Sequence, residues 1–166
     1  MELLILNILL LVLLGGIVYQ DFKYREIHVL LIVGIFFVAL GLVWITDKEL
    51  LAFLRPFLFV VVVTGGVWSY ISIRQKKIID PFSHHIGLGD ILFFAAITPL
   101  FGLHSYILFF ITGMILAILF SLVFKEYVKQ RLIPLAGILA CLLMLLKIVS
   151  WGLGKEIFYK FNFLMV

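Results

Sequence analysis

Six apolar stretches separated by short polar segments make up most of this chain of 166 residues. Hydrophobic residues account for 65% of the sequence and charged residues for 13%, and the mean hydropathy is +1.28. These values lie far outside those of soluble domains, and a helix that crosses a membrane needs about 20 mainly apolar residues. The sequence therefore predicts an all-α, polytopic membrane protein that forms a single domain over residues 1–166.

Charged residues and helix breakers set the limits of the six stretches. Pro99, Gly102 and His104 separate the fourth stretch from the fifth, because the two together are too long for one membrane crossing. We expect six transmembrane helices, followed by a tail at residues 151–166 that lies along the membrane interface. The predicted helices span residues 3–20, 27–45, 50–73, 88–101, 105–124 and 132–150.

Basic residues concentrate in the loops after the first, third and fifth predicted helices. Such a bias marks cytoplasmic loops, so we expect the protein in the cell membrane with its N-terminus outside. The expected partner from composition is the lipid bilayer, and no feature indicates a nucleic acid. The basic residues in these loops are Lys23, Arg25, Arg74, Lys76, Lys77, Lys125, Lys129 and Arg131.

Two aspartates stand at the same predicted end of the bundle. Asp21 follows the first apolar stretch, and Asp90 opens the fourth within Gly87-Leu88-Gly89-Asp90. Because two membrane crossings separate them, both carboxyls are expected at the cytoplasmic face. An ionisable group at a membrane segment is costly to keep, so each aspartate is a candidate functional residue.

Two nearby carboxyls in a site of low dielectric share one proton. One of them can then take a proton from a water that attacks a peptide carbonyl, while the other donates a proton to the carbonyl oxygen. Gly87 and Gly89 would remove side chains beside Asp90 and let an extended substrate approach. The pattern therefore favours an aspartic peptidase with a catalytic pair of Asp21 and Asp90.

Other interpretations of the two aspartates stay open. Asp90 can cap the fourth helix through its backbone N–H groups, and Asp21 can pair locally with Lys23 or Arg25. The pair can also relay ions in a small proton- or cation-coupled carrier, although a carrier would favour carboxyls near the midplane of the bilayer. A membrane scaffold would leave both aspartates unexplained.

The histidines and the single cysteine do not indicate a metal site. His84 and His85, with Asp80 and Asp90, have the chemistry of metal ligands. Adjacent histidines in one loop seldom converge on one ion, however, so we expect neither a metal nor another cofactor, and the role of the histidines stays open. Cys141 lies in an apolar stretch and is expected to pack between helices.

Three short segments form a combination along the chain. They are Asp21-Phe22-Lys23-Tyr24-Arg25-Glu26-Ile27, Gly87-Leu88-Gly89-Asp90 and Ile133-Pro134-Leu135-Ala136-Gly137. Together they resemble the aspartate element, the GxGD motif and the isoleucine-proline element of the type IV prepilin peptidases, a family of membrane aspartic proteases. The resemblance extends from Asp21 to about Ala140.

The resemblance implies a GxGD aspartyl protease-like bundle in which Asp21 and Asp90 are the catalytic residues. The implied substrates are prepilin-like membrane proteins, namely pilins, pseudopilins or flagellin-like precursors, whose basic leader is removed at the cytoplasmic face. The further residues that the matching motifs imply at the active site or in substrate approach are Gly87, Gly89, Lys23, Arg25 and Pro134.

The chain departs from the family's pattern at several positions. His28 stands where the family usually has proline, and Leu92 stands where a lysine is common. The cytoplasmic region with a cysteine zinc cluster, associated with N-methylation in long members, does not precede the first predicted helix. We therefore expect a short form, similar to preflagellin and tight-adherence prepilin peptidases, that cleaves without methylating.

Overall fold

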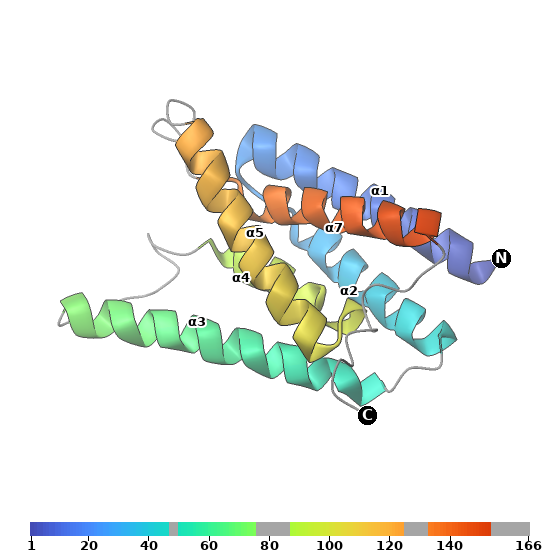
Figure 1. The fold of residues 1–166 in the computed structure, drawn as a ribbon, viewed down its shortest axis with the longest axis horizontal. Helices are drawn as coiled ribbons and strands as arrows, with labels where there is room; N and C mark the ends of the chain where they lie inside the picture. Colours follow the sequence, from blue (N-terminus) through green and yellow to red (C-terminus); the bar gives the residue numbers. More distant parts are fainter. Residues whose placement is uncertain (47–49, 76–86, 125–132, 154–166) are drawn as a thin grey trace.

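A computed structural model describes residues 1–46, 50–75, 87–124 and 133–153, and within these ranges all regular structure is helical. The all-α class is therefore confirmed for this part of the chain. The α-helices are α1 (Glu2–Tyr24), α2 (Val29–Ile45), α3 (Leu54–Gln75), α4 (Leu88–Ala96), α5 (Leu103–Val123) and α7 (Leu135–Leu153), as Figure 1 shows. Two short 3₁₀ helices, η1 (Leu50–Phe53) and η2 (Thr98–Leu100), precede α3 and follow α4.

Four of the described helices, α1, α3, α5 and α7, are long and apolar enough to cross a membrane. Helix α2 has 17 residues and α4 has nine, fewer than the roughly 20 that a full crossing needs. The predicted helix at residues 88–101 is instead α4 followed by η2, in which Pro99 cannot continue an α-helical hydrogen-bond ladder. The structure thus supports a helical membrane protein, while the full set of six crossings stays a prediction.

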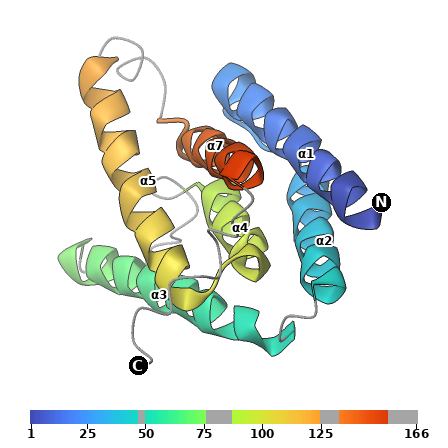
Figure 2. The same cartoon turned by 45° about the vertical axis from the view of Figure 1, so that its right-hand side comes forward.

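The helices run in alternating directions through the bundle. In Figures 1 and 2, α1 lies beside α2 and α7, and α4 lies in the interior between α2, α3 and α7. At one end of the bundle, the rings of Phe22 in α1 and Phe120 in α5 meet edge to face at 5.9 Å. The end of α1, the end of α5 and the starts of α4 and α7 therefore gather at this end.

The core follows the helical spacing of apolar residues. Phe93 and Ile97 from the α4 region pack with residues of α1 and α7 that are fully buried. Residues three or four apart lie on one face of a helix, so a regular buried stripe runs along α1. Its members are Leu10, Leu14, Ile17 and Asp21.

The turn from α1 to α2 is tight and is closed by side-chain and backbone bonds. Arg25 ends α1 in the left-handed conformation, with φ of 61°, and its N–H donates to the carbonyl of Asp21. Gln20 then accepts a hydrogen bond of 2.8 Å from the N–H of His28, the residue just before α2. A proline at position 28 would have no N–H to donate, so this closure of the turn requires a residue such as His28.

A buried tyrosine fastens the end of α4 to α5. The hydroxyl of Tyr106 donates to the carbonyl of Phe94 at 2.9 Å, and the Tyr106 ring packs edge to face against Phe59 and Phe101. Because α4 stops after nine residues, its last carbonyls need hydrogen-bond donors of this kind. The contact lets a short helix end inside the protein.

Outside the described residues lie most of the predicted C-terminal tail and several loop residues. Of residues 151–166, the structure describes Trp151–Leu153, which continue α7 beyond the predicted limit at residue 150.

Candidate active site

Asp21 and Asp90 meet at the first turn of α7. The backbone N–H of Gly137 donates to Oδ2 of Asp21 at 2.6 Å, and the N–H of Ala136 donates to Oδ1 of Asp90 at 3.0 Å. Since Ala136 and Gly137 are consecutive residues, the two carboxyls lie beside one helical turn, where they interact electrostatically. The structure brings together the two predicted carboxyls, and their catalytic role stays a prediction.

The start of α7 attracts acceptors because of how it is built. The first N–H groups of an α-helix have no partner within the helix, and Pro134, immediately before α7, has no side-chain acceptor to satisfy them. The N–H groups of Leu135 and Ile138 bond to main-chain carbonyls just before the helix. Those of Ala136 and Gly137 are left for the two carboxyls, and the positive end of the helix dipole favours negative charge there.

Helix α1 brings Asp21 to this position from a different element. Helix α1 continues to Tyr24 rather than ending at residue 20 as predicted, so Asp21 lies inside its last turn. Four positions after Ile17, it continues the buried stripe and is only 6% exposed. The third residue of α4 is Asp90, which is half-buried. Separate helices therefore supply the two carboxyls.

The two glycines of the GxGD segment have different neighbours. A Cβ at Gly87 would lie 2.7 Å from Oδ2 of Asp90, so this glycine leaves room for the carboxyl itself. A Cβ at Gly89 would meet Cδ1 of Ile27 at 3.4 Å, an ordinary van der Waals distance. The expectation that both glycines clear space beside Asp90 is therefore met by Gly87, whereas Gly89 packs on the α1–α2 turn.

Gly137 makes room for Asp21 in the same way. A Cβ at this position would lie 2.9 Å from Cδ2 and Cε2 of the Phe22 ring and 3.0 Å from Oδ2 of Asp21. Sequence reasoning selected Pro134 from this segment and missed the two amides that follow it. The only signal for them was a proline within the first turn of the helix predicted at residues 132–150.

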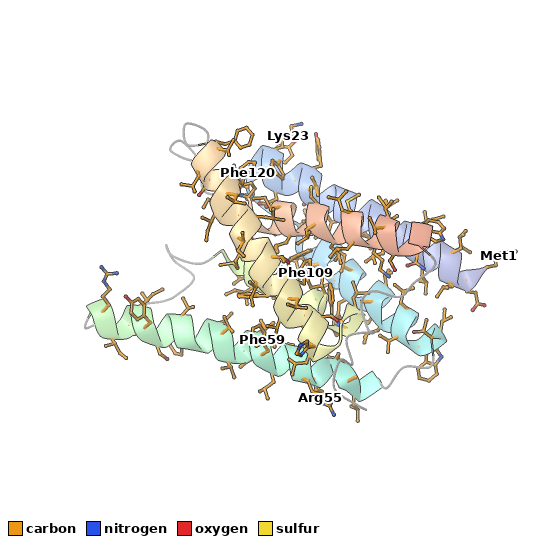
Figure 3. All side chains as sticks on the ribbon, in the orientation of Figure 1. Met1, Lys23, Arg55, Phe59, Phe109 and Phe120 are labelled. Carbon is orange, nitrogen blue, oxygen red and sulfur yellow. The ribbon has the colours of Figure 1, made fainter. Side chains whose placement is uncertain are left out.

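The two basic residues near Asp21 lie in different directions. The side chain of Arg25 is half-buried and interacts electrostatically with Asp21. Lys23 is exposed, and its Nζ donates to the hydroxyl oxygen of Tyr19 at 2.5 Å, on the outer side of α1 (Figure 3). Residues two apart on a helix lie on nearly opposite faces. The structure therefore places Arg25 near the carboxyl pair and does not place Lys23 there.

Other predicted positions do not add charge to the site. Leu92 is partly buried against the apolar core and brings no charge to the site. His84, His85 and Asp80 lie outside the described residues. Within the described ranges, no three His, Cys, Asp or Glu side chains form a group suited to a metal.

The geometry suits acid–base chemistry by two carboxyls. One oxygen of each is held by an amide, and neither Oδ1 of Asp21 nor Oδ2 of Asp90 bonds to another described residue. A water or a peptide carbonyl can therefore approach the free oxygens of an oriented pair. The local alternatives do not account for the two carboxyls: no side chain caps α4, and among the residues that the structure describes Asp21 forms no ion pair with a lysine. Instead, both aspartates satisfy the start of α7.

Over the described residues the protein is all-helical, with four helices long and apolar enough to cross a membrane. Two carboxyls converge on the start of one of these four helices, α7. Comparison of the chain with protein-family models, with curated proteins and with solved structures finds no match in any of the three.

Proposed function

We propose that this protein is a membrane aspartic endopeptidase in which Asp21 and Asp90 activate a water molecule. The observation that carries the proposal is the convergence of two carboxyls, from α1 and α4, on neighbouring amides of α7. A carboxyl pair held in this way is oriented before substrate arrives, which is the condition that efficient acid–base catalysis requires.

In the proposed reaction the two carboxyls share one proton. The ionised carboxyl takes a proton from water as the water oxygen attacks the peptide carbonyl, and the protonated carboxyl donates to the carbonyl oxygen. The roles reverse when the tetrahedral intermediate collapses and the amine leaves with a proton. The amides of Ala136 and Gly137 hold the carboxyls in place throughout and take no proton themselves.

The proposed substrates are prepilin-like precursors with a basic leader next to a hydrophobic helix. The three motif segments around Asp21, Asp90 and Pro134 support this choice through their resemblance to prepilin peptidases. The bias of basic residues supports an outside N-terminus and a site at the cytoplasmic face of the cell membrane. We further propose that the protein cleaves without N-methyltransferase activity.

The two carboxyls could instead serve only to cap the start of α7. Substitution by asparagine distinguishes this structural role from a catalytic one. Asparagine keeps a side-chain oxygen that can accept the amide hydrogen bond, and it caps helices about as well as aspartate. It cannot act as a general acid or base. Asp21→Asn and Asp90→Asn should therefore keep the fold and remove the chemistry, whereas Asp→Ala at either position would remove both.

The test is leader removal from a co-expressed prepilin-like substrate, followed by the change in substrate mass. We expect both Asn variants to lose cleavage by about 100-fold or more, with wild-type abundance and thermal stability. Glu26→Gln removes one exposed carboxylate beside the α1–α2 turn and is the matched control, which should cleave normally. Cleavage that survives either Asn substitution would refute the mechanism. Proton flux into vesicles that depends on both aspartates, without cleavage, would favour the carrier.

A further inference from the structure

A cluster of two tyrosines and a lysine occupies the outer side of the last turns of α1. Nζ of Lys23 bonds to the Tyr19 hydroxyl oxygen and lies 4.9 Å and 5.0 Å from the ring centroids of Tyr19 and Tyr24. The two rings meet edge to face at 6.2 Å. Both tyrosines are 57% exposed, so the cluster, here called the Tyr19–Lys23–Tyr24 cluster, faces the surroundings of the protein.

Helix geometry separates this cluster from the carboxyl pair. Tyr19 and Lys23 are four residues apart and share one face of α1, whereas Asp21 points into the bundle from the other side. Figure 3 shows Lys23 at the upper edge of the molecule, at the end of α1. Among the residues that the structure describes, no carboxylate forms an ion pair with Lys23. Aromatic rings, not acidic groups, hold its ammonium.

The length of α1 would place the cluster at the depth of lipid headgroups in a membrane. Helix α1 has 23 residues and is therefore about 35 Å long, slightly more than the roughly 30 Å hydrocarbon core. When α1 crosses the bilayer, its last turn emerges at the membrane–water boundary. Tyrosine and lysine are the residues that favour this boundary, because each combines an apolar body with a polar tip.

The cluster also presents hydrogen-bond donors in the form that a phosphate accepts. The ammonium of Lys23 interacts with the hydroxyls of both Tyr19 and Tyr24, which leaves at least one of its three hydrogens to donate to a further group. We propose that the Tyr19–Lys23–Tyr24 cluster binds the phosphate of an anionic phospholipid and so fixes the end of α1 at headgroup depth. A zwitterionic headgroup suits the site less well because its own cation offsets the phosphate charge.

Lipid binding here would set the depth of the carboxyl pair. Asp21 precedes Lys23 by two residues, or about 3 Å along the helix axis. An anchored Lys23 therefore holds Asp21 just beneath the phosphate plane. Lipid binding at the cluster requires no catalysis, so it can be measured in protein that has no substrate.

The test is native mass spectrometry of the full-length protein in detergent, titrated with phosphatidylglycerol or phosphatidylcholine. We expect wild type to retain phosphatidylglycerol in preference, and Lys23→Gln to weaken that binding about fivefold, the effect of one basic residue near an anionic surface. Tyr19→Phe keeps the ring but loses the hydroxyl and should weaken it at least twofold. Lys23→Arg should bind as wild type does. Arg74→Gln removes an exposed cation from the end of α3 and is the matched control.

Several outcomes would overturn the lipid site. Equal retention of the two lipids by wild type would do so, as would equal losses in Lys23→Gln and Arg74→Gln, which would mean a general effect of charge. Displacement of phosphatidylglycerol by inorganic phosphate would indicate a site for soluble anions. Unchanged lipid binding in Lys23→Gln, together with weaker capture of a prepilin-like substrate, would assign the cluster to a peptide. Thermal unfolding of each variant confirms that a folded protein is compared.

Discussion

At the scale of single residues, the site depends on where small side chains leave room for carboxyls. Asp90 and Asp21 each approach a glycine so closely that an added methyl carbon would lie 2.7 Å and 3.0 Å, respectively, from a carboxyl oxygen. The backbone at Gly87 has φ of −65°, which any residue adopts, so the requirement for glycine there is one of space and not of backbone freedom. Substitutions at these glycines therefore test the positions of the carboxyls directly.

Gly87→Ala and Gly89→Ala should differ in activity although both alter the same motif. The added methyl at Gly87 displaces the Asp90 carboxyl, and a shift of about 1 Å in a catalytic group can lower the rate about 100-fold. At Gly89 the methyl meets Ile27 at an ordinary distance, so we expect activity within about threefold of wild type. Leader cleavage per folded protein is the measurement. Equal losses in the two variants would mean that Gly89 also serves the substrate.

Gly137→Ala should disturb the site from the side of α7. Its methyl would press on the Phe22 ring and on Asp21, and overpacking of this kind costs about 1–3 kcal/mol. We expect a lower Tm and a loss of cleavage. Gly65→Ala is the matched control, because it also lies within a helix and its methyl would meet nothing within 4 Å. A Gly137→Ala protein with normal stability and activity would argue against the close packing around Asp21.

At the scale of the elements, the short helix α4 is the unusual part of the bundle. It carries Asp90 at its start and ends after nine residues inside the protein, where η2 and the Tyr106 hydroxyl replace a further helical turn. A short helix with one end tied to α5 and the other bonded to α7 has little freedom to shift along its axis. The bond to α7 holds Asp90 itself, and the bond to α5 holds the opposite end of α4.

Tyr106→Phe should weaken the fold without touching the carboxyl pair. Loss of the hydroxyl leaves the buried carbonyl of Phe94 without its partner, which costs about 1–3 kcal/mol. We expect a Tm lower by several degrees in detergent, with cleavage per folded protein unchanged. Tyr70→Phe, at an exposed tyrosine of α3, is the control and should leave the Tm as it is. An unchanged Tm in Tyr106→Phe would mean that water replaces the hydroxyl.

At the scale of the whole molecule, the alternation of helix directions decides which loops share a side of the membrane. The ends of α1 and α5 and the starts of α4 and α7 gather at one end of the bundle. In the other half of the α1–α7 pair, Nζ of Lys147 donates to Oδ1 of Asn7 at 3.2 Å. Polar contacts along this helix pair therefore fix its register at two separate points.

Cysteine labelling can test whether α2, which is shorter than α3, crosses the membrane. In a Cys141→Ala background, Glu2→Cys should react with an impermeant maleimide in intact cells, because the N-terminus is expected outside. Glu26→Cys and Arg74→Cys should react only after the membrane is opened, since two crossings bring the chain back to the same side. Labelling of Arg74→Cys from outside, with Glu26→Cys protected, would show that only one of α2 and α3 crosses.

The sequence by itself determined the class of the fold and marked Asp21 and Asp90 as the candidate functional residues. Apolar stretches of membrane-spanning length leave helices as the structure in which every backbone group is bonded, and carboxyls are so costly at such segments that two of them stand out. These inferences depend on composition and spacing, which are local properties of the chain. The number of crossings and the activity are not decided by them.

The tertiary structure alone decided what surrounds the carboxyls. The amides of Ala136 and Gly137 were invisible in the sequence because every residue except proline carries the same N–H, and only the place where α7 begins leaves these two free. The separation of Lys23 from Arg25, and of Gly87 from Gly89, likewise depends on where α1 ends and how α4 enters the bundle. Helical phase turns neighbours in sequence to different faces, so residues of one motif acquire different surroundings.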